Sequence, residues 1–158
     1  METPMSIQQF QFTAVFIASL HACAYPLNGE WEGIERQVIV DGAVSEKFSI
    51  PYEECYPSFD PETQELIEGT STCIERGFSM HIDGANEIIF EASNSLNEGQ
   101  EILLSTLSYI EDIHILTDGS HFEISCVLDT STKEKLLYCD FTNTLGYLNS
   151  SRIVFSKD

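Results

Sequence analysis

The segment Phe78-Ser79-Met80-His81-Ile82-Asp83-Gly84 combines two signals that recur along this 158-residue chain. Apolar side chains alternate with polar ones, which is typical of a strand with one buried face. Asp-Gly then ends the run, and this dipeptide suits the two positive-φ positions of a type I′ hairpin turn. The segment therefore predicts an antiparallel strand that ends in a tight turn.

Both signals recur on either side of this segment. Further turn signals stand at Asp41-Gly42, Asn97-Glu98-Gly99 and Asp118-Gly119. Strands are expected at 31–40, 44–52, 65–74, 88–92, 102–109, 113–117, 122–128, 136–141 and 152–155. Short hairpins make successive strands neighbours in a sheet, and a long meander closes to avoid two bare edges. We expect an all-β protein, an antiparallel up-and-down meander closed into a barrel of about 8–10 strands. It forms a single domain over 25–158.

The composition limits the partners that the chain can bind. There are 26 Asp and Glu against 7 Lys and Arg, which gives a formal net charge of −19. Such a surface repels phosphate backbones and anionic lipid headgroups, so we expect no nucleic-acid partner and no membrane partner. The acidity either keeps a small protein soluble or supplies an acidic pocket for an amine ligand.

Residues 1–24 have the features of a signal peptide. The apolar run Phe12–Leu20 is followed by Ala22-Cys23-Ala24, an A-x-A cleavage site, although no Lys or Arg precedes the run. One alternative is an N-terminal helix over Ser6–Ala22, packed against the closed end of the barrel. A loose lipobox at Leu20–Cys23 is another. We expect cleavage and a secreted or extracytoplasmic location.

Cleavage after Ala24 would leave an even number of cysteines, as disulfides in a short secreted chain require. The hairpin turns expected near 60–61 and 130–135 each have one cysteine on either side. Opposed positions of paired strands have Cβ atoms about 4.5–5.5 Å apart, near enough for a bridge. The alternative is four buried thiols in a reducing cell. We expect two disulfides, Cys126–Cys139 and Cys55–Cys73.

Motifs for catalysis and metal binding are missing from the sequence. It contains no G-x-S-x-G elbow, C-x-x-C, H-E-x-x-H, EF-hand spacing or glycine-rich phosphate loop. His81 and His121 fall on polar strand faces, and Glu53-Glu54 is typical of a solvated surface. We therefore expect a binding protein rather than an enzyme, with no catalytic residue, no metal and no cofactor.

Alternation leaves one set of apolar side chains for the inside of the barrel. A barrel of about eight strands is just wide enough for these side chains or for one small ligand. They either line a cavity or fill the barrel completely, because both outcomes need the same alternation. The expected ligand-binding residues are Phe48, Ile50, Phe78, Met80, Phe90, Phe122 and Ile124.

Gly29-Glu30-Trp31 enters the first expected strand, and Arg152 lies in the last. A Gly-x-Trp at the head of a meander, with a basic residue in the closing strand, resembles the lipocalins and their calycin relatives. The resemblance covers Leu27–Lys157. It implies that Gly29, Trp31 and Arg152 close the barrel, with the guanidinium across the indole ring. The Thr-Asp-Tyr loop of core lipocalins is missing, so the chain resembles outlying members.

The resemblance implies an exported carrier or scavenger of a small apolar or amine-bearing molecule, acting as a monomer or dimer. A second reading is a lipocalin-fold lyase that passes bilins to phycobiliproteins inside a cell or plastid, since Ser151–Phe155 resembles the closing strand of that group. A third is an interaction module with a filled barrel. Oxidised cysteines favour the carrier, and reduced cysteines with a retained N-terminal helix favour the lyase.

Overall fold

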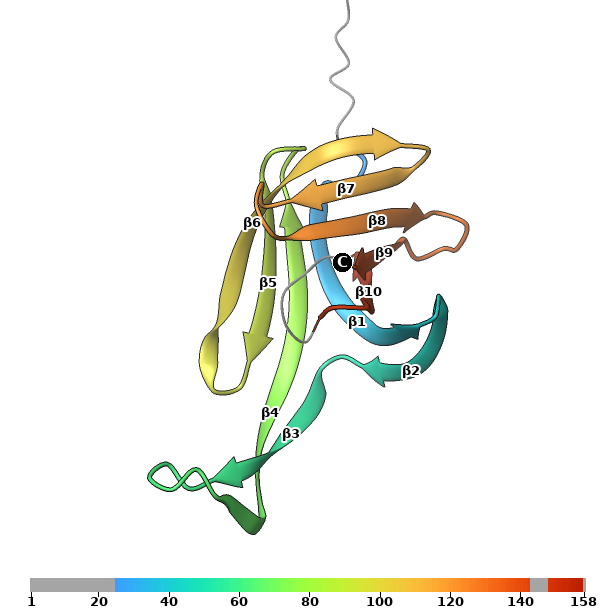
Figure 1. Ribbon diagram of the computed structural model, residues 1–158. Coiled ribbons are helices and arrows are strands. Elements are labelled where there is room, and N and C mark those ends of the chain that lie inside the picture. The colour runs from blue at the N-terminus through green and yellow to red at the C-terminus, as the bar shows by residue number, and fades with distance from the viewer. Residues whose placement is uncertain (1–24, 143–147, 158) are drawn as a thin grey trace, which may run out of the picture.

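The computed structural model of this protein describes residues 25–142 and 148–157. The expected signal segment or helix at 1–24 lies outside these residues. Among the described residues, no helix is long and apolar enough to span a membrane. The described chain is an antiparallel meander of ten strands (Figure 1): β1 (Gly29–Val40), β2 (Ala43–Ser49), β3 (Tyr52–Phe59), β4 (Leu66–Ile82), β5 (Ile88–Asn94), β6 (Asn97–Ile110), β7 (Ile113–Thr117), β8 (Glu123–Asp129), β9 (Leu136–Phe141) and β10 (Ser151–Lys157).

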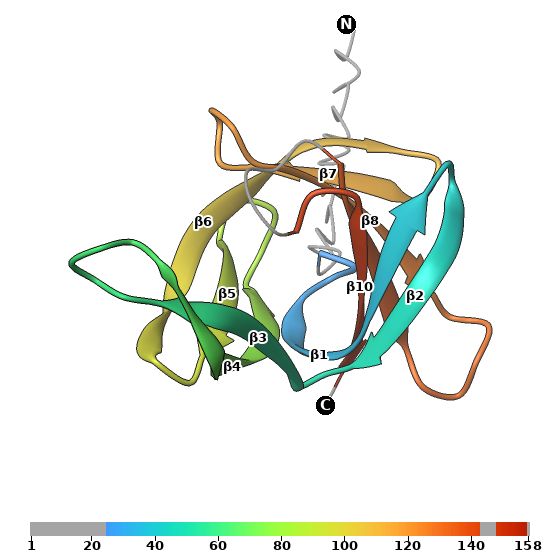
Figure 2. The ribbon, with the colours of Figure 1, turned by 60° about the horizontal axis from the view of Figure 1, so that its bottom comes forward.

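Eight of these strands close into a barrel, which confirms the expected fold class. The sheet order is β2-β1-β10-β9-β8-β7-β6-β5-β4-β3, and a further pairing of β1 with β4 joins the two ends. This closing pairing is short, with Gly29–Glu32 opposite Ser79–Ile82. Beyond it β1 and β4 diverge, so β2 continues along β1 and β3 along β4 as extra strands (Figures 1 and 2).

The direction of the strands gives the barrel two different ends. The β4–β5, β6–β7 and β8–β9 turns lie at one end, together with the segment 25–28 that enters β1. We call this the closed end. The β1–β2, β5–β6 and β7–β8 turns lie at the other end, which we call the mouth. The Gly29–Trp31 motif is therefore at the closed end.

Inward-facing side chains of the eight strands pack into one core. A chain of rings crosses it: Phe78 stacks on Phe90 at 6.1 Å between centroids, and Phe90 contacts Phe122 at 5.9 Å and Phe141 at 5.3 Å. Full burial of each such side chain stabilises the fold by about 1.5–3 kcal/mol. The centre of the barrel is thus filled by aromatic side chains rather than open from end to end.

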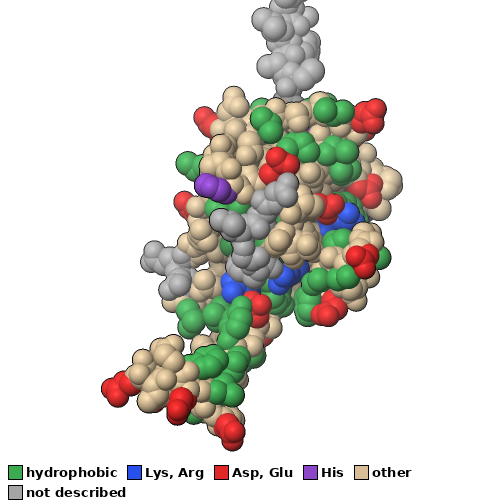
Figure 3. Space-filling view, in the orientation of Figure 1, with side chains coloured by type: hydrophobic (Ala, Val, Ile, Leu, Met, Phe, Trp, Pro, Cys, Tyr) green, Lys and Arg blue, Asp and Glu red, His purple; other side chains and the backbone are tan. Residues whose placement is uncertain are grey.

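Residues 53–75, which we call the arm, project from the barrel (Figures 1 and 3). The two sequence segments expected as separate strands, 65–74 and 78–82, are one 17-residue strand, β4. The part of β4 up to Arg76 pairs with β3, and the part from Arg76 onward pairs with β5. An isolated two-stranded hairpin is only marginally stable in water, so the arm benefits from a covalent link between its strands.

Both expected disulfides are present. Cys126–Cys139 joins opposed positions of β8 and β9 and is fully buried. Cys55–Cys73 joins opposed positions of β3 and β4 in the arm and is exposed. The Glu53 carboxylate lies within 4.8 Å of both arm sulfurs, but disulfide sulfurs are not thiolates and do not ligate a metal in this state.

Two turn positions differ from the sequence prediction. The expected strand 44–52 is divided, since β2 ends at Ser49 and β3 begins at Tyr52, with Pro51 between them lacking an N–H for a ladder. The turn expected at 97–99 is at 95–96, where Asn94 pairs with Asn97. By contrast Asp41-Gly42 is a tight turn with positive φ at both residues, 51° and 78°.

Candidate ligand site in the barrel

Trp31 plugs the closed end. Its side chain is 1% exposed, and its Nε1 donates a hydrogen bond to the carbonyl oxygen of Leu27 at 2.7 Å. Lys157 lies opposite Trp31 on β10, with Nζ 5.6 Å from the ring centroid, and donates to the carbonyl oxygen of Asn28. A side chain at Gly29 would be strained, because φ there is +135°, and its Cβ would lie 2.5 Å from Cε of Lys157, which would have to move away from its place over Trp31.

The cation over Trp31 is Lys157, so the placement of Arg152 across the indole is corrected. Arg152 lies on the outer face of β10 and binds Asp140 through Nε–Oδ1 at 2.5 Å and Nη2–Oδ2 at 2.9 Å. Strand alternation explains the difference. Phe155 faces the core, and therefore Lys157, two residues further on, also faces inward while Arg152 faces outward.

A cavity of about 280 Å³ opens inside the barrel near the mouth. Phe90 and Phe122 form part of its wall, so the ring cluster at the centre of the barrel is its floor. Its volume is near the lower end of the roughly 300–1,000 Å³ typical of small-molecule pockets. The lining residues are Phe90, Ala92, Gln100, Ile102, Asp118, His121, Phe122 and Leu148.

Of the expected ligand-binding residues, Phe90 and Phe122 line this cavity. Phe78 lies beside it, since it stacks on Phe90 and pairs in register with Ala92. Paired residues share a face of the sheet, and Ala92 lies two residues after Phe90 in β5, so Phe78 and Phe90 face the same side. The alternation in β4 and β5, together with the position of Phe122 directly before β8, thus brings these three rings to the same part of the interior.

The remaining expected residues lie elsewhere. Met80 and Ile124 are buried in the core and do not reach the cavity wall. Ile50 connects β2 to β3 and packs against the core from the side. Phe48 is 36% exposed, because β2 lies outside the closed ring of strands.

Sequence reasoning missed Gln100, Asp118 and His121 in the cavity wall. Gln100 faces inward opposite Ala92. It was missed because a turn was expected at 97–99, where β6 in fact begins. Asp118 and His121 belong to the β7–β8 turn. Outside a strand, the alternation of apolar and polar residues does not indicate which side chains face inward. Ala92 was recognisable, since it continues the alternation of Ile88 and Phe90.

The Asp118 carboxylate builds the rim of the cavity. One of its oxygens, Oδ1, accepts hydrogen bonds from the backbone N–H groups of Ser120, His121 and Phe122 at 2.8–2.9 Å. These bonds hold the pKa of the Asp118 carboxyl far below its ordinary value. The carboxylate therefore stays ionised and holds the β7–β8 turn in its conformation.

Two arginines face inward at the mouth, where the arm leaves the barrel and Figure 3 shows basic side chains. Nη1 of Arg36 donates to the Tyr52 hydroxyl at 2.7 Å, and its guanidinium carbon lies 5.5 Å from the Tyr52 ring centroid. Arg76, opposite Tyr52 in register, forms an ion pair with Glu54 at 2.5 Å. Burial opposes ionisation of Glu54, but hydrogen bonds from Tyr56 and Arg76 hold its pKa below the ordinary value.

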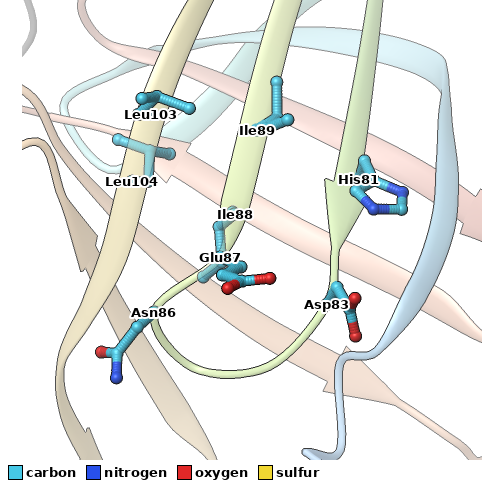
Figure 4. A pocket seen from close by; sticks show the side chains of 8 residues that line it. All are labelled: His81, Asp83, Asn86, Glu87, Ile88, Ile89, Leu103 and Leu104. Atoms are coloured by element: carbon cyan, nitrogen blue, oxygen red, sulfur yellow. The ribbon is translucent and has the colours of Figure 1, made fainter.

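A second hollow, of about 340 Å³, lies near the closed end on β4, β5 and β6 (Figure 4). Its apolar part includes Leu103, which is 72% exposed, and the neighbouring His81 bonds to the Glu30 carboxylate. Exposed polar side chains contribute to both spaces, but the cavity at the mouth is floored by rings of the aromatic core. The residues around it are His81, Asp83, Asn86, Glu87, Ile88, Ile89, Leu103 and Leu104.

His114 fixes the entering chain to the closed end. It is 2% exposed, and its Nδ1 hydrogen-bonds the Tyr25 hydroxyl at 2.9 Å, which also bonds Oγ1 of Thr106 at 2.7 Å. The Tyr109 ring lies against the imidazole at 4.4 Å between centroids. Burial lowers the pKa of His114, and the nearby Asp112 carboxylate opposes this effect without cancelling it.

Stability is therefore expected to fall as the pH drops below about 6.5, the ordinary histidine pKa. The unfolded chain takes up a proton at that pH, whereas folded His114 resists protonation, so acid favours unfolding. Urea midpoints measured at about pH 7.5 and about pH 5.5 test this. His114→Gln should reduce the difference between the two midpoints, and His121→Gln, at an exposed position, should keep it. An equal pH response in His114→Gln and the parent would contradict the assignment.

Comparisons of this chain with protein-family models, curated proteins and solved structures give no match.

Proposed function

We propose that this protein is a lipocalin-like carrier or scavenger that binds a small, mostly apolar molecule in the cavity at the barrel mouth. The observation that carries the proposal is the asymmetry of the barrel. Trp31 and Lys157 plug one end, while an apolar cavity floored by Phe90 and Phe122 lies at the other. Affinity comes from removing apolar ligand surface from water, at about 25 cal/mol per Å².

Size and lining favour this function over the bilin-lyase alternative. A cavity of about 280 Å³ suits a ligand of modest size rather than an extended tetrapyrrole. The two disulfides also favour an oxidising, extracytoplasmic compartment, as a secreted carrier would occupy, over the reducing interior of a cell.

A neutral fluorescent probe, N-phenyl-1-naphthylamine, tests the proposal. We expect saturable binding with increased probe fluorescence and energy transfer from Trp31, the single tryptophan of the chain. Ala92→Phe should weaken binding at least about tenfold, because the added ring occupies the cavity that Ala92 lines.

Leu103→Phe is the matched control, since it adds a ring at an exposed position outside the barrel. It should bind the probe like the parent protein, and thermal unfolding should show that both variants are folded. Probe binding that Ala92→Phe leaves unchanged, or that Leu103→Phe removes, would overturn the assignment of the cavity as the binding site.

A further inference from the structure

We infer that the ligand is an amphiphile with an anionic head, a carboxylate or a group of similar charge, which Arg36 and Arg76 bind at the mouth while its apolar part enters the cavity. This inference rests on the proposed function and adds the chemical class of the ligand.

Strand register places the head site beside the cavity. Tyr52, Arg76 and Asn94 form one row across β3, β4 and β5, and the next row on the same face, toward the closed end, has Phe78 and Ala92. Two residues along a strand span about 6.6 Å. A small ligand can therefore contact the arginines with one end and the apolar cavity wall with the other.

Tyr52 and Ser151 orient the guanidinium of Arg36. Nη1 donates to the Tyr52 hydroxyl, and Nε and Nη2 donate to Oγ of Ser151 at 3.2 and 3.1 Å. Burial raises the pKa of Tyr52, although Arg36 opposes this, so the phenol stays neutral at physiological pH. A guanidinium carries five N–H donors in a fixed fork, which suits bidentate binding of a carboxylate. Tyr52 and Ser151 therefore fix the orientation of the Arg36 guanidinium before a ligand binds.

The charge of the cluster formed by Arg36, Arg76 and Glu54 is opposite in sign to that of the whole molecule. Two of the seven Lys and Arg residues of a chain with net charge −19 face inward here. Both act electrostatically on Glu54, so the three groups form one cluster with a formal charge of +1. The side chain of Arg76 is only 11% exposed. Removing guanidinium groups from water is costly, and an anionic head would offset part of that cost.

Distant carboxylates do not cancel this local attraction. The Debye length at physiological ionic strength is about 8 Å, so most of the surface charge is screened at the mouth. An amine head beside Tyr52 would meet the arginine cluster, and the charge of Asp118 on the cavity rim is partly offset by the three backbone N–H groups that donate to it. The expectation of an amine ligand from net charge alone therefore gives way to an anionic one.

Three probes with the same alkyl chain test the inference: decanoate, decanol and decylammonium, each used to displace N-phenyl-1-naphthylamine. We expect decanoate to bind at least about tenfold more tightly than decanol, and decylammonium to bind most weakly. Arg36→Met should remove the preference for decanoate and leave decanol binding unchanged. Tyr52→Phe keeps the charge but loses the orienting hydroxyl, so the preference should shrink; this variant serves if Arg36→Met does not fold.

Arg152→Met is the matched control, because it removes an arginine from the outer face and should keep the decanoate preference. Equal affinities of decanoate and decanol for the parent would overturn the inference while leaving the proposed function intact. Tighter binding of decylammonium, or loss of the preference in Arg152→Met, would also overturn it. Failure of the neutral naphthylamine itself to bind would overturn the proposed function.

Discussion

Trp31→Ala is expected to lower the free energy of unfolding by about 3–5 kcal/mol, the cost typical of truncating a large buried aromatic side chain. The indole is almost fully buried between Leu27, Met80 and Lys157 at the closed end. Trp31 also belongs to the short β1–β4 pairing that closes the ring of strands, so its loss weakens the element that converts the sheet into a barrel.

Urea unfolding followed by far-ultraviolet circular dichroism measures this effect, because the variant has no tryptophan fluorescence. Trp31→Phe keeps most of the apolar volume and should cost less than Trp31→Ala. Lys157→Met and Arg152→Met form a matched pair on β10, and only the first removes a cation from the indole face. A loss below about 1 kcal/mol for Trp31→Ala would contradict a closed end held by Trp31.

The two disulfides are expected to differ in their contribution to stability. Replacing Cys126 and Cys139 by alanine should cost about 3 kcal/mol in the unfolding of the barrel. Replacing Cys55 and Cys73 should leave that transition almost unchanged. The sequence separations, 13 and 18 residues, are similar, so loop entropy alone would give similar costs.

Location explains the expected difference. The Cys126–Cys139 bridge lies in the core, whereas the other bridge lies in the arm, which can unfold locally while the barrel stays intact. Chemical denaturation of the two double variants reports the barrel, and amide hydrogen exchange at 53–75 reports the arm. Equal losses of barrel stability in the two variants would show that arm and barrel unfold as one unit.

Much of the barrel follows from the sequence because its signals are local. The alternation of Ile88, Phe90 and Ala92 gives the inner face of β5, and Asp41-Gly42 gives a turn with both residues at positive φ. The break at Pro51 and the turn at 95–96 are less visible, since the alternation of apolar residues runs on through the first and no glycine marks the second. The divergence of β1 from β4 was also missed, because a long-range pairing leaves no local pattern.

The candidate site was predictable only in part. Phe90 and Phe122 follow from alternation, but whether aromatic rings fill a barrel or floor a cavity depends on packing across several strands. The cation over the indole was assigned to Arg152 by resemblance, while alternation counted from Phe155 points to Lys157. The inward direction of Arg36 follows a register shift between Gly33 and Glu35, which reverses the alternation of β1.

A crystal structure of the protein with bound decanoate would test the central claim most directly. The account predicts one decanoate in the barrel, with its carboxylate within hydrogen-bond distance of the Arg36 guanidinium and its alkyl chain over Phe90 and Phe122. Decanoate bound in the outer hollow beside His81 and Leu103, with the barrel cavity empty, would contradict it.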